Sequence, residues 1–96
     1  MASVYILYST SIDTFYIGSC QNLEERIRQH KDKNFETAYT RQVDDWDLFF
    51  CINNLEYQQA RSIESHIKNM KSRKYLHDLK QYPDMSVKLA DRYKNQ

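Results

Sequence analysis

The chain has 96 residues, 41% of them hydrophobic and 28% charged, and its formal net charge is +1. These values lie near the averages of globular domains, so they exclude a disordered or collagen-like chain, and the length allows a single domain with its own core. A net charge this close to zero gives no overall attraction to nucleic acid, although a cluster of basic residues can still make one face locally positive.

The first predicted elements form a β-hairpin. Residues 3–8 and 15–17 are rich in β-branched and aromatic residues, which favours two strands, and residues 10–13 supply the turn between them. We expect Gly18 to end the second strand, because glycine adopts a positive φ without steric cost.

Helices and one more strand follow the hairpin. Asn22 is a predicted N-cap, with two glutamates after it in the first turn of a helix. Residues 33–45 are polar and predict a loop, residues 46–52 a third strand, residues 53–54 a turn or cap, and residues 55–70 the longest helix. Ser72 begins a further helix to about Gln81, and Pro83 prevents its continuation.

The predicted order is therefore β-β-α-β-α-α. It gives an α+β fold in which helices cover a small three-stranded, at least partly antiparallel sheet. We expect one domain over residues 1–83 and a short tail with helical potential over residues 84–96.

The ends and the cysteines of the sequence favour a cytoplasmic protein. The first residues have no basic segment before an apolar run, so we expect no signal peptide, and no apolar run is long enough to cross a membrane. Cys20 and Cys51 do not have metal-site spacing, and we expect two reduced thiols.

Four sequence motifs resemble those of the GIY-YIG endonuclease family over about residues 3–79. Val4-Tyr5-Ile6 and Tyr16-Ile17-Gly18 resemble the paired strand motifs, although Ser3 stands where the first motif usually has glycine. The next helix resembles the family's Leu-x-x-Arg-x-x-x-His pattern, and residues 60–68 resemble its Ala-x-x-x-Glu-x-x-Ile-Lys helix. The matching residues of these two helices are Leu23, Arg26, His30, Ala60, Glu64, Ile67 and Lys68.

This resemblance implies a metal-dependent endonuclease that hydrolyses DNA, with one Mg²⁺ or Mn²⁺ ion. Glu64 is the only carboxylate in a largely apolar and basic helical stretch, and a single carboxylate is a common protein ligand of Mg²⁺. Arg26 can offer its planar fork of donors to the scissile phosphate. By resemblance one of Tyr5 and Tyr16 is the general base, its pKa lowered by Arg26 and the metal. The predicted catalytic set is Tyr5, Tyr16, Arg26, His30 and Glu64, and the predicted phosphate-binding set is Ser19, Lys68 and Lys74.

Other interpretations of the same residues remain open. Glu64 can be an ordinary surface partner of Lys68, His30 a buried and hydrogen-bonded histidine, and the tyrosines packing residues. Lys68 and Lys74 can equally be solvated surface lysines. The alternative function is a non-catalytic module that retains the fold and binds nucleic acid or protein. The sequence leaves open the oligomeric state, the DNA target, and the choice between repair, recombination, mobile-element and restriction roles.

Overall fold

The computed structural model describes residues 1–32, 43 and 45–94, with the side chains of residues 29–32 excepted. Most of the predicted loop over residues 33–45 therefore lies outside the described residues. The described part contains one antiparallel sheet of three strands: β1 (Ala2–Ser9), β2 (Thr14–Cys20) and β3 (Trp46–Leu55). Their order is β2-β1-β3, which confirms the predicted α+β class and leaves β2 and β3 as edge strands.

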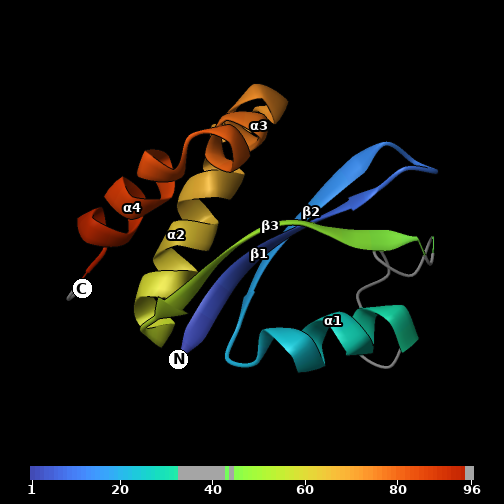
Figure 1. Cartoon of the computed structure of the whole chain (residues 1–96), viewed down its shortest axis with the longest axis horizontal. Helices are drawn as coiled ribbons and strands as arrows, with labels where there is room; N and C mark the ends of the chain where they lie inside the picture. The colour runs from blue at the N-terminus through green and yellow to red at the C-terminus, as the bar shows by residue number, and fades with distance from the viewer. Residues whose placement is uncertain (33–42, 44, 95–96) are drawn as a thin grey trace.

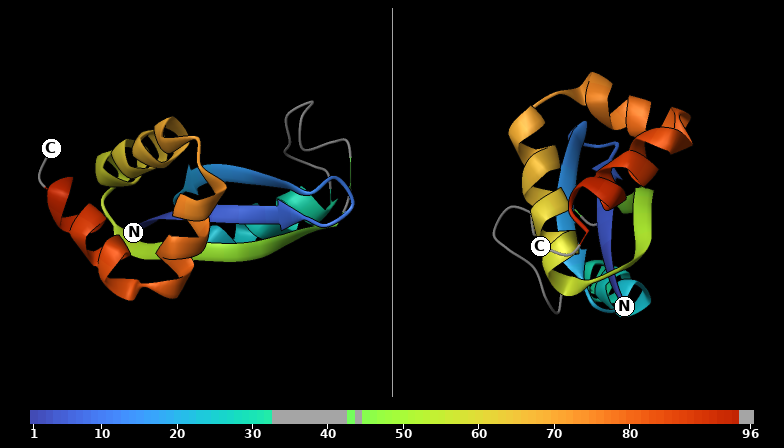
Figure 2. Two further views of the ribbon diagram at one scale, coloured as in Figure 1. Left: turned by 90° about the horizontal axis from the view of Figure 1, so that it is seen from above. Right: turned by 90° about the vertical axis from the view of Figure 1, so that its left-hand side faces the viewer.

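Helices cover both faces of this sheet (Figure 1, Figure 2). One face carries α1 (Leu23–Asp32), and the other carries α2 (Tyr57–Met70), α3 (Arg73–Gln81) and α4 (Pro83–Arg92). The observed order is thus the predicted one with α4 added, in the region predicted as a tail. Cys20 and Cys51 are both free thiols.

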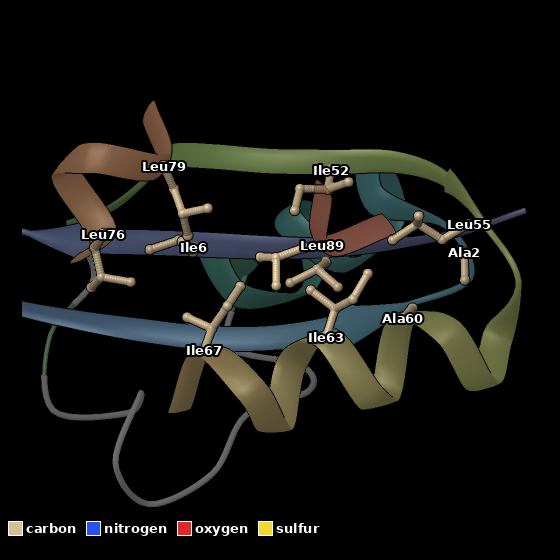
Figure 3. Close-up of a cluster of buried hydrophobic side chains, with 11 residues drawn as sticks. Ala2, Ile6, Ile52, Leu55, Ala60, Ile63, Ile67, Leu76, Leu79 and Leu89 are labelled. Atoms are coloured by element: carbon tan, nitrogen blue, oxygen red, sulfur yellow. The ribbon is translucent and has the colours of Figure 1, made fainter. Parts of the chain in front are cut away.

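Strand β1 contributes side chains to a hydrophobic core on each face of the sheet, because successive side chains of a strand point to opposite faces. Ala2, Val4 and Ile6 face α2, α3 and α4 in the larger core, which Figure 3 shows in close-up. Tyr5 and Leu7 face α1 in the smaller core. Position along β1 therefore decides on which side of the sheet each functional residue lies.

Two predicted helix starts are confirmed by their caps. The Asn22 side chain accepts a hydrogen bond from the backbone of Glu25 (3.0 Å) at the start of α1, as Ser72 does from Tyr75 (3.2 Å) at the start of α3. Pro83 ends the α3 region as expected, and it also begins α4, because proline suits the first turn of a helix.

The predicted boundary between the third strand and the longest helix is wrong. β3 continues to Leu55, which pairs with Ala2, and Asn54 adopts a φ of 61° where the pairing with β1 is irregular. Asparagine tolerates this left-handed conformation, so the Asn-Asn pair belongs to an irregular strand and not to a turn. α2 begins at Tyr57, and Glu56 is its N-cap. The Glu56 backbone N–H donates a hydrogen bond to the Gln59 side chain (3.0 Å).

The prediction for Gly18 is also wrong. Gly18 lies inside β2, paired with Tyr5, and its φ is not positive. Position 18 requires glycine because any side chain there would collide with Tyr5.

Candidate active site

Tyr5 lies over Gly18 on the neighbouring strand. A Cβ atom added at Gly18 would stand 2.5 Å from the Tyr5 hydroxyl oxygen and 2.6 Å from the ring carbon that bears it. Real Cβ atoms essentially never approach other atoms so closely, so only glycine lets the tyrosine ring rest on the β2 backbone. This lack of space explains why the tyrosine of the first strand motif is paired with the glycine of the second.

The surroundings of Tyr5 keep its hydroxyl protonated. The side chain is 0% exposed, and Arg26 donates a hydrogen bond to it. Burial raises the pKa of Tyr5 well above its usual value, the nearby Tyr16 raises it further, and Arg26 lowers it by less. Arg26 therefore acts in the predicted direction, but burial prevails, and Tyr5 is a neutral hydrogen-bonding phenol.

Tyr16 shares this face of the sheet with Tyr5 but is less buried. Its ring centroid lies 6.3 Å from that of Tyr5 and 6.3 Å from that of Trp46, and the side chain retains partial exposure. Of the two predicted tyrosines, Tyr16 is the one that solvent can reach.

The first turn of α1 brings Arg26 to this pair. The Asn22 cap fixes the start of the helix, and the Arg26 backbone N–H bonds the Asn22 carbonyl (3.0 Å). The half-buried Arg26 also lines an open cleft of about 440 Å³ beside Ser19 and Tyr57. His30 lies in α1 one turn beyond Arg26, but its side chain is outside the described part of the chain.

Glu64 lies on the other face of the sheet, on α2. Its Oε1 accepts a hydrogen bond from the Ser19 hydroxyl (2.5 Å), and its Oε2 accepts one from the Lys68 ammonium (2.6 Å). The Glu64 side chain is 20% exposed, so it is held on two sides while solvent still reaches it. The ion pair with Lys68, the alternative interpretation of Glu64, is present, and Ser19 adds a contact from the sheet.

Edge strand β2 connects the two groups. Ser19 bonds Glu64 on the α2 side and also lines the cleft that contains Arg26. The predicted set is therefore divided between two faces: Tyr5, Tyr16 and Arg26 lie on the α1 side, and Ser19, Glu64 and Lys68 on the α2 side. Ser19, on edge strand β2, is the residue that connects them.

Lys74 lies away from the Arg26 cleft, and Tyr57, which the sequence analysis does not name, lines it. Lys74 projects from α3 and pairs with Asp78 (3.0 Å), which raises the pKa of Lys74, and it does not line the Arg26 cleft. Tyr57 was missed, although it is 45% exposed at the rim of this cleft with the Arg61 guanidinium carbon 5.7 Å from its ring centre. A correct prediction of the start of α2 would have identified Tyr57, because the first residue of this helix follows directly after the end of β3 and the Glu56 cap.

The donor chemistry around Glu64 suits a hard divalent cation. Within residues 1–32, 43 and 45–94, no three or more His, Cys, Asp or Glu side chains gather into a metal cluster. Mg²⁺ does not need such a cluster, because it keeps several waters and accepts one carboxylate together with substrate phosphate. The oxygens of Glu64 and Ser19 and the remaining exposure of the carboxylate fit that mode of binding.

No helix in the described part of the chain is long and apolar enough to cross a membrane. In the comparisons with known proteins, the model of the GIY-YIG catalytic domain matches residues 1–76. No curated protein and no solved structure gives a significant match. The matched region contains both strand motifs, α1, α2 and the contacts at the β2 edge. The chain therefore belongs to the GIY-YIG family and carries its catalytic domain, which implies nuclease-type hydrolysis of phosphodiester bonds in nucleic acid.

Proposed function

We propose that this chain is a metal-dependent endonuclease that cleaves DNA at the β2 edge. The observation that carries the proposal is the position of Ser19, which holds the Glu64 carboxylate and lines the cleft of Arg26. A phosphate at this edge would have a fixed carboxylate on one side and a guanidinium on the other.

Glu64 is the proposed ligand of one Mg²⁺ or Mn²⁺ ion. Ser19 orients the carboxylate, and Lys68 would share Glu64 with the ion or give up its contact. When bound, the ion supplies positive charge that offsets the negative charge developing on the phosphate.

Arg26 is the proposed partner of the scissile phosphate. A guanidinium can donate two parallel hydrogen bonds to phosphate oxygens, and this fixes orientation as well as charge. The Tyr5 hydroxyl, buried over Gly18, accepts a bond from Arg26 and so holds its position. Tyr5 is therefore a positioning residue in this proposal.

Tyr16 is the proposed general base. It is the partly exposed member of the pair, whereas Tyr5 is fully buried and its pKa is raised. A base has to reach the water whose proton it takes, directly or through one further water. His30, by its place one turn after Arg26, is proposed to bond the phosphate or a tyrosine hydroxyl.

The remaining predicted residues have supporting roles. Ser19 positions Glu64, and Lys68, next to Glu64, would contact a phosphate of the substrate. Lys74, highly exposed on α3, contributes to the positive potential that attracts DNA and not to a specific contact.

The test is cleavage of supercoiled plasmid in the presence of Mg²⁺. We expect Glu64→Gln to abolish cleavage with the fold unchanged by circular dichroism, and EDTA to abolish cleavage by the wild type. The matched control is Glu24→Gln, the same substitution at an exposed position in the first turn of α1, which should cleave like the wild type. Full activity of Glu64→Gln would refute the metal-ligand assignment.

One observation favours the alternative of a non-catalytic binding module. Both oxygens of Glu64 are engaged by protein donors, as in a carboxylate whose role is only structural. In that case the wild type would bind DNA or a protein partner without cutting at any concentration of Mg²⁺ or Mn²⁺, and Glu64→Gln would mainly lower the thermal midpoint.

A further inference from the structure

A groove lies along β2, on the face that carries α2 and α3. It has a volume of about 260 Å³ and an apolar floor, and its rim is basic. The floor includes Ile17, Ile67 and Leu76, and the rim is formed by Lys68, Lys71 and Arg73. Lys68 joins the groove to the active site, because it also bonds Glu64.

A second, aromatic cleft continues the groove. It has a volume of about 220 Å³ and shares Phe15 and Arg73 with the groove. Phe15, Phe49 and His77 pack edge to face around it, with ring centroids 5.0 to 5.9 Å apart. Lys80 lies 4.5 Å above the ring of Phe49. Ligand pockets for drug-sized molecules have roughly 300–1,000 Å³, so a cleft of this size suits a single planar group.

The two cavities follow one line of residues on β2. Ser19, Ile17 and Phe15 are every second residue of β2, so all three face the α2 side of the sheet. Ser19 contacts Glu64 of α2, Ile17 lines the groove with Ile67 and Leu76, and Phe15 lines the aromatic cleft with His77 of α3. The four steps from Ser19 to Phe15 cover roughly 14 Å, at about 3.4 Å per residue. In duplex DNA each strand advances about 3.4 Å per nucleotide, and an unstacked single strand extends farther, so this distance spans at most about four nucleotides.

We propose that this surface binds a single strand of DNA leaving the cleavage site, with phosphates on Lys68, Lys71 and Arg73 and an unpaired base in the cleft of Phe15, Phe49 and His77. The inference rests on the proposed function for the position of the cut. Five residues of this surface, which we call the track, have no role in that function: Phe15, Phe49, Lys71, Arg73 and His77. The track therefore adds a substrate class to the proposed function.

The charges of this surface favour a phosphate backbone, and its aromatic cleft favours a single strand over a duplex. Lys71 has no ion-pair partner among the residues that the structure describes, and its ammonium is available for a phosphate. Arg73 pairs with Asp13, but both side chains are more than half exposed, so a phosphate can displace the carboxylate. Bases in a duplex are already stacked and paired, whereas an unpaired base can place its ring against aromatic side chains.

The experiment compares two ligands without cleavage. Fluorescence anisotropy in EDTA measures binding to a single strand of about 12 nucleotides and to the blunt duplex of the same sequence. We expect the wild type to prefer the single strand. His77→Ala, at an exposed helix position, should weaken single-strand binding about fivefold or more and leave duplex binding unchanged.

A charge variant tests the phosphate contacts. Lys71→Asn removes one charge, and asparagine suits the left-handed backbone at this position. The slope of log K against log salt for the single strand should become shallower by about 0.7, the value for one phosphate contact. The matched control is Lys88→Asn on α4, which lines neither cavity and should keep the slope of the wild type. Thermal midpoints of all variants show that each is folded.

The outcomes separate this inference from the proposed function. Equal or tighter binding of blunt duplex, or an equal effect of His77→Ala on both ligands, would overturn the track even if Glu64-dependent cleavage is found. Single-strand preference that depends on His77 and Lys71, without any cleavage, would support the track and refute the endonuclease.

Discussion

Tyr5 and Tyr16 have the same side chain and face the same side of the sheet, yet their surroundings differ. Tyr5 is sealed between Gly18 and Arg26, and burial raises its pKa, whereas Tyr16 keeps contact with solvent. The sequence motifs identify both residues but cannot separate their roles, because the difference comes from the packing of α1 and from the space above one glycine.

The two tyrosines should respond differently to removal of the hydroxyl. We expect Tyr16→Phe to lower the single-turnover rate roughly a hundredfold, the typical contribution of a general base, and to change the shape of the pH–rate profile, which reports the essential base of an enzyme. Tyr5→Phe should keep the shape of the pH–rate profile at a lower plateau, because it only releases Arg26. It should also cost about 1 kcal/mol of stability, the net value of one hydrogen bond.

The control for these variants is Tyr82→Phe, at the half-exposed junction of α3 and α4. It should leave both the rate and the thermal midpoint unchanged. If instead Tyr5→Phe alters the shape of the pH–rate profile and Tyr16→Phe does not, the two roles are exchanged.

At the scale of elements, the sequence predicts the order and most of the caps, and it fails where local pattern and tertiary pairing disagree. Asn53 and Asn54 have the composition of a turn, but pairing of Leu55 with Ala2 extends β3 through them, and Ser3 donates a hydrogen bond to Asn53 (2.9 Å). The contact of Ser19 with Glu64 joins residues 45 positions apart, so no local pattern predicts it.

The C-terminal end of α2 gives a test of backbone strain. Lys71 ends the helix with a φ of 48°, a conformation that costs a residue with a Cβ atom about 1–2 kcal/mol and costs glycine little. We expect Lys71→Gly to raise the thermal midpoint by about 4–8 °C for each kcal/mol gained. If Lys71 binds phosphate as proposed, the same variant should bind single-stranded DNA more weakly.

Glycine at an ordinary helix position provides the comparison. Lys88→Gly, within α4, should cost about 1 kcal/mol and lower the midpoint. A lower midpoint for Lys71→Gly as well would show that the lysine side chain stabilises the fold by more than its backbone strains it.

At the scale of the whole molecule, the core extends beyond the region that matches the family. The match ends at residue 76, but Leu79 and Leu89 are buried in the larger core with Ile63 (Figure 3). The Gln59 side chain also donates a hydrogen bond to the Ala90 carbonyl (2.7 Å), which ties α4 to α2. The helical potential of this segment was visible in the sequence, but its packing against α2 was not.

Removal of residues 83–96 should therefore destabilise the domain. The loss of Leu89 alone is expected to cost about 2–5 kcal/mol, a large part of the stability of so small a protein. Thermal unfolding followed by circular dichroism should show a much lower or absent cooperative transition for residues 1–82. Leu89→Ala in the full chain should show an intermediate midpoint, and an unchanged midpoint for the truncated chain would mean that α4 is dispensable.

The contact between Tyr5 and Gly18 also limits how this sequence can evolve. Any larger residue at position 18 collides with the tyrosine ring, and a smaller residue at position 5 leaves a hollow over the glycine. Each single substitution is therefore unfavourable while the other residue is unchanged. The two positions, 13 residues apart in the chain and adjacent in the sheet, are expected to change together or not at all, even in lineages where the surrounding surface diverges freely.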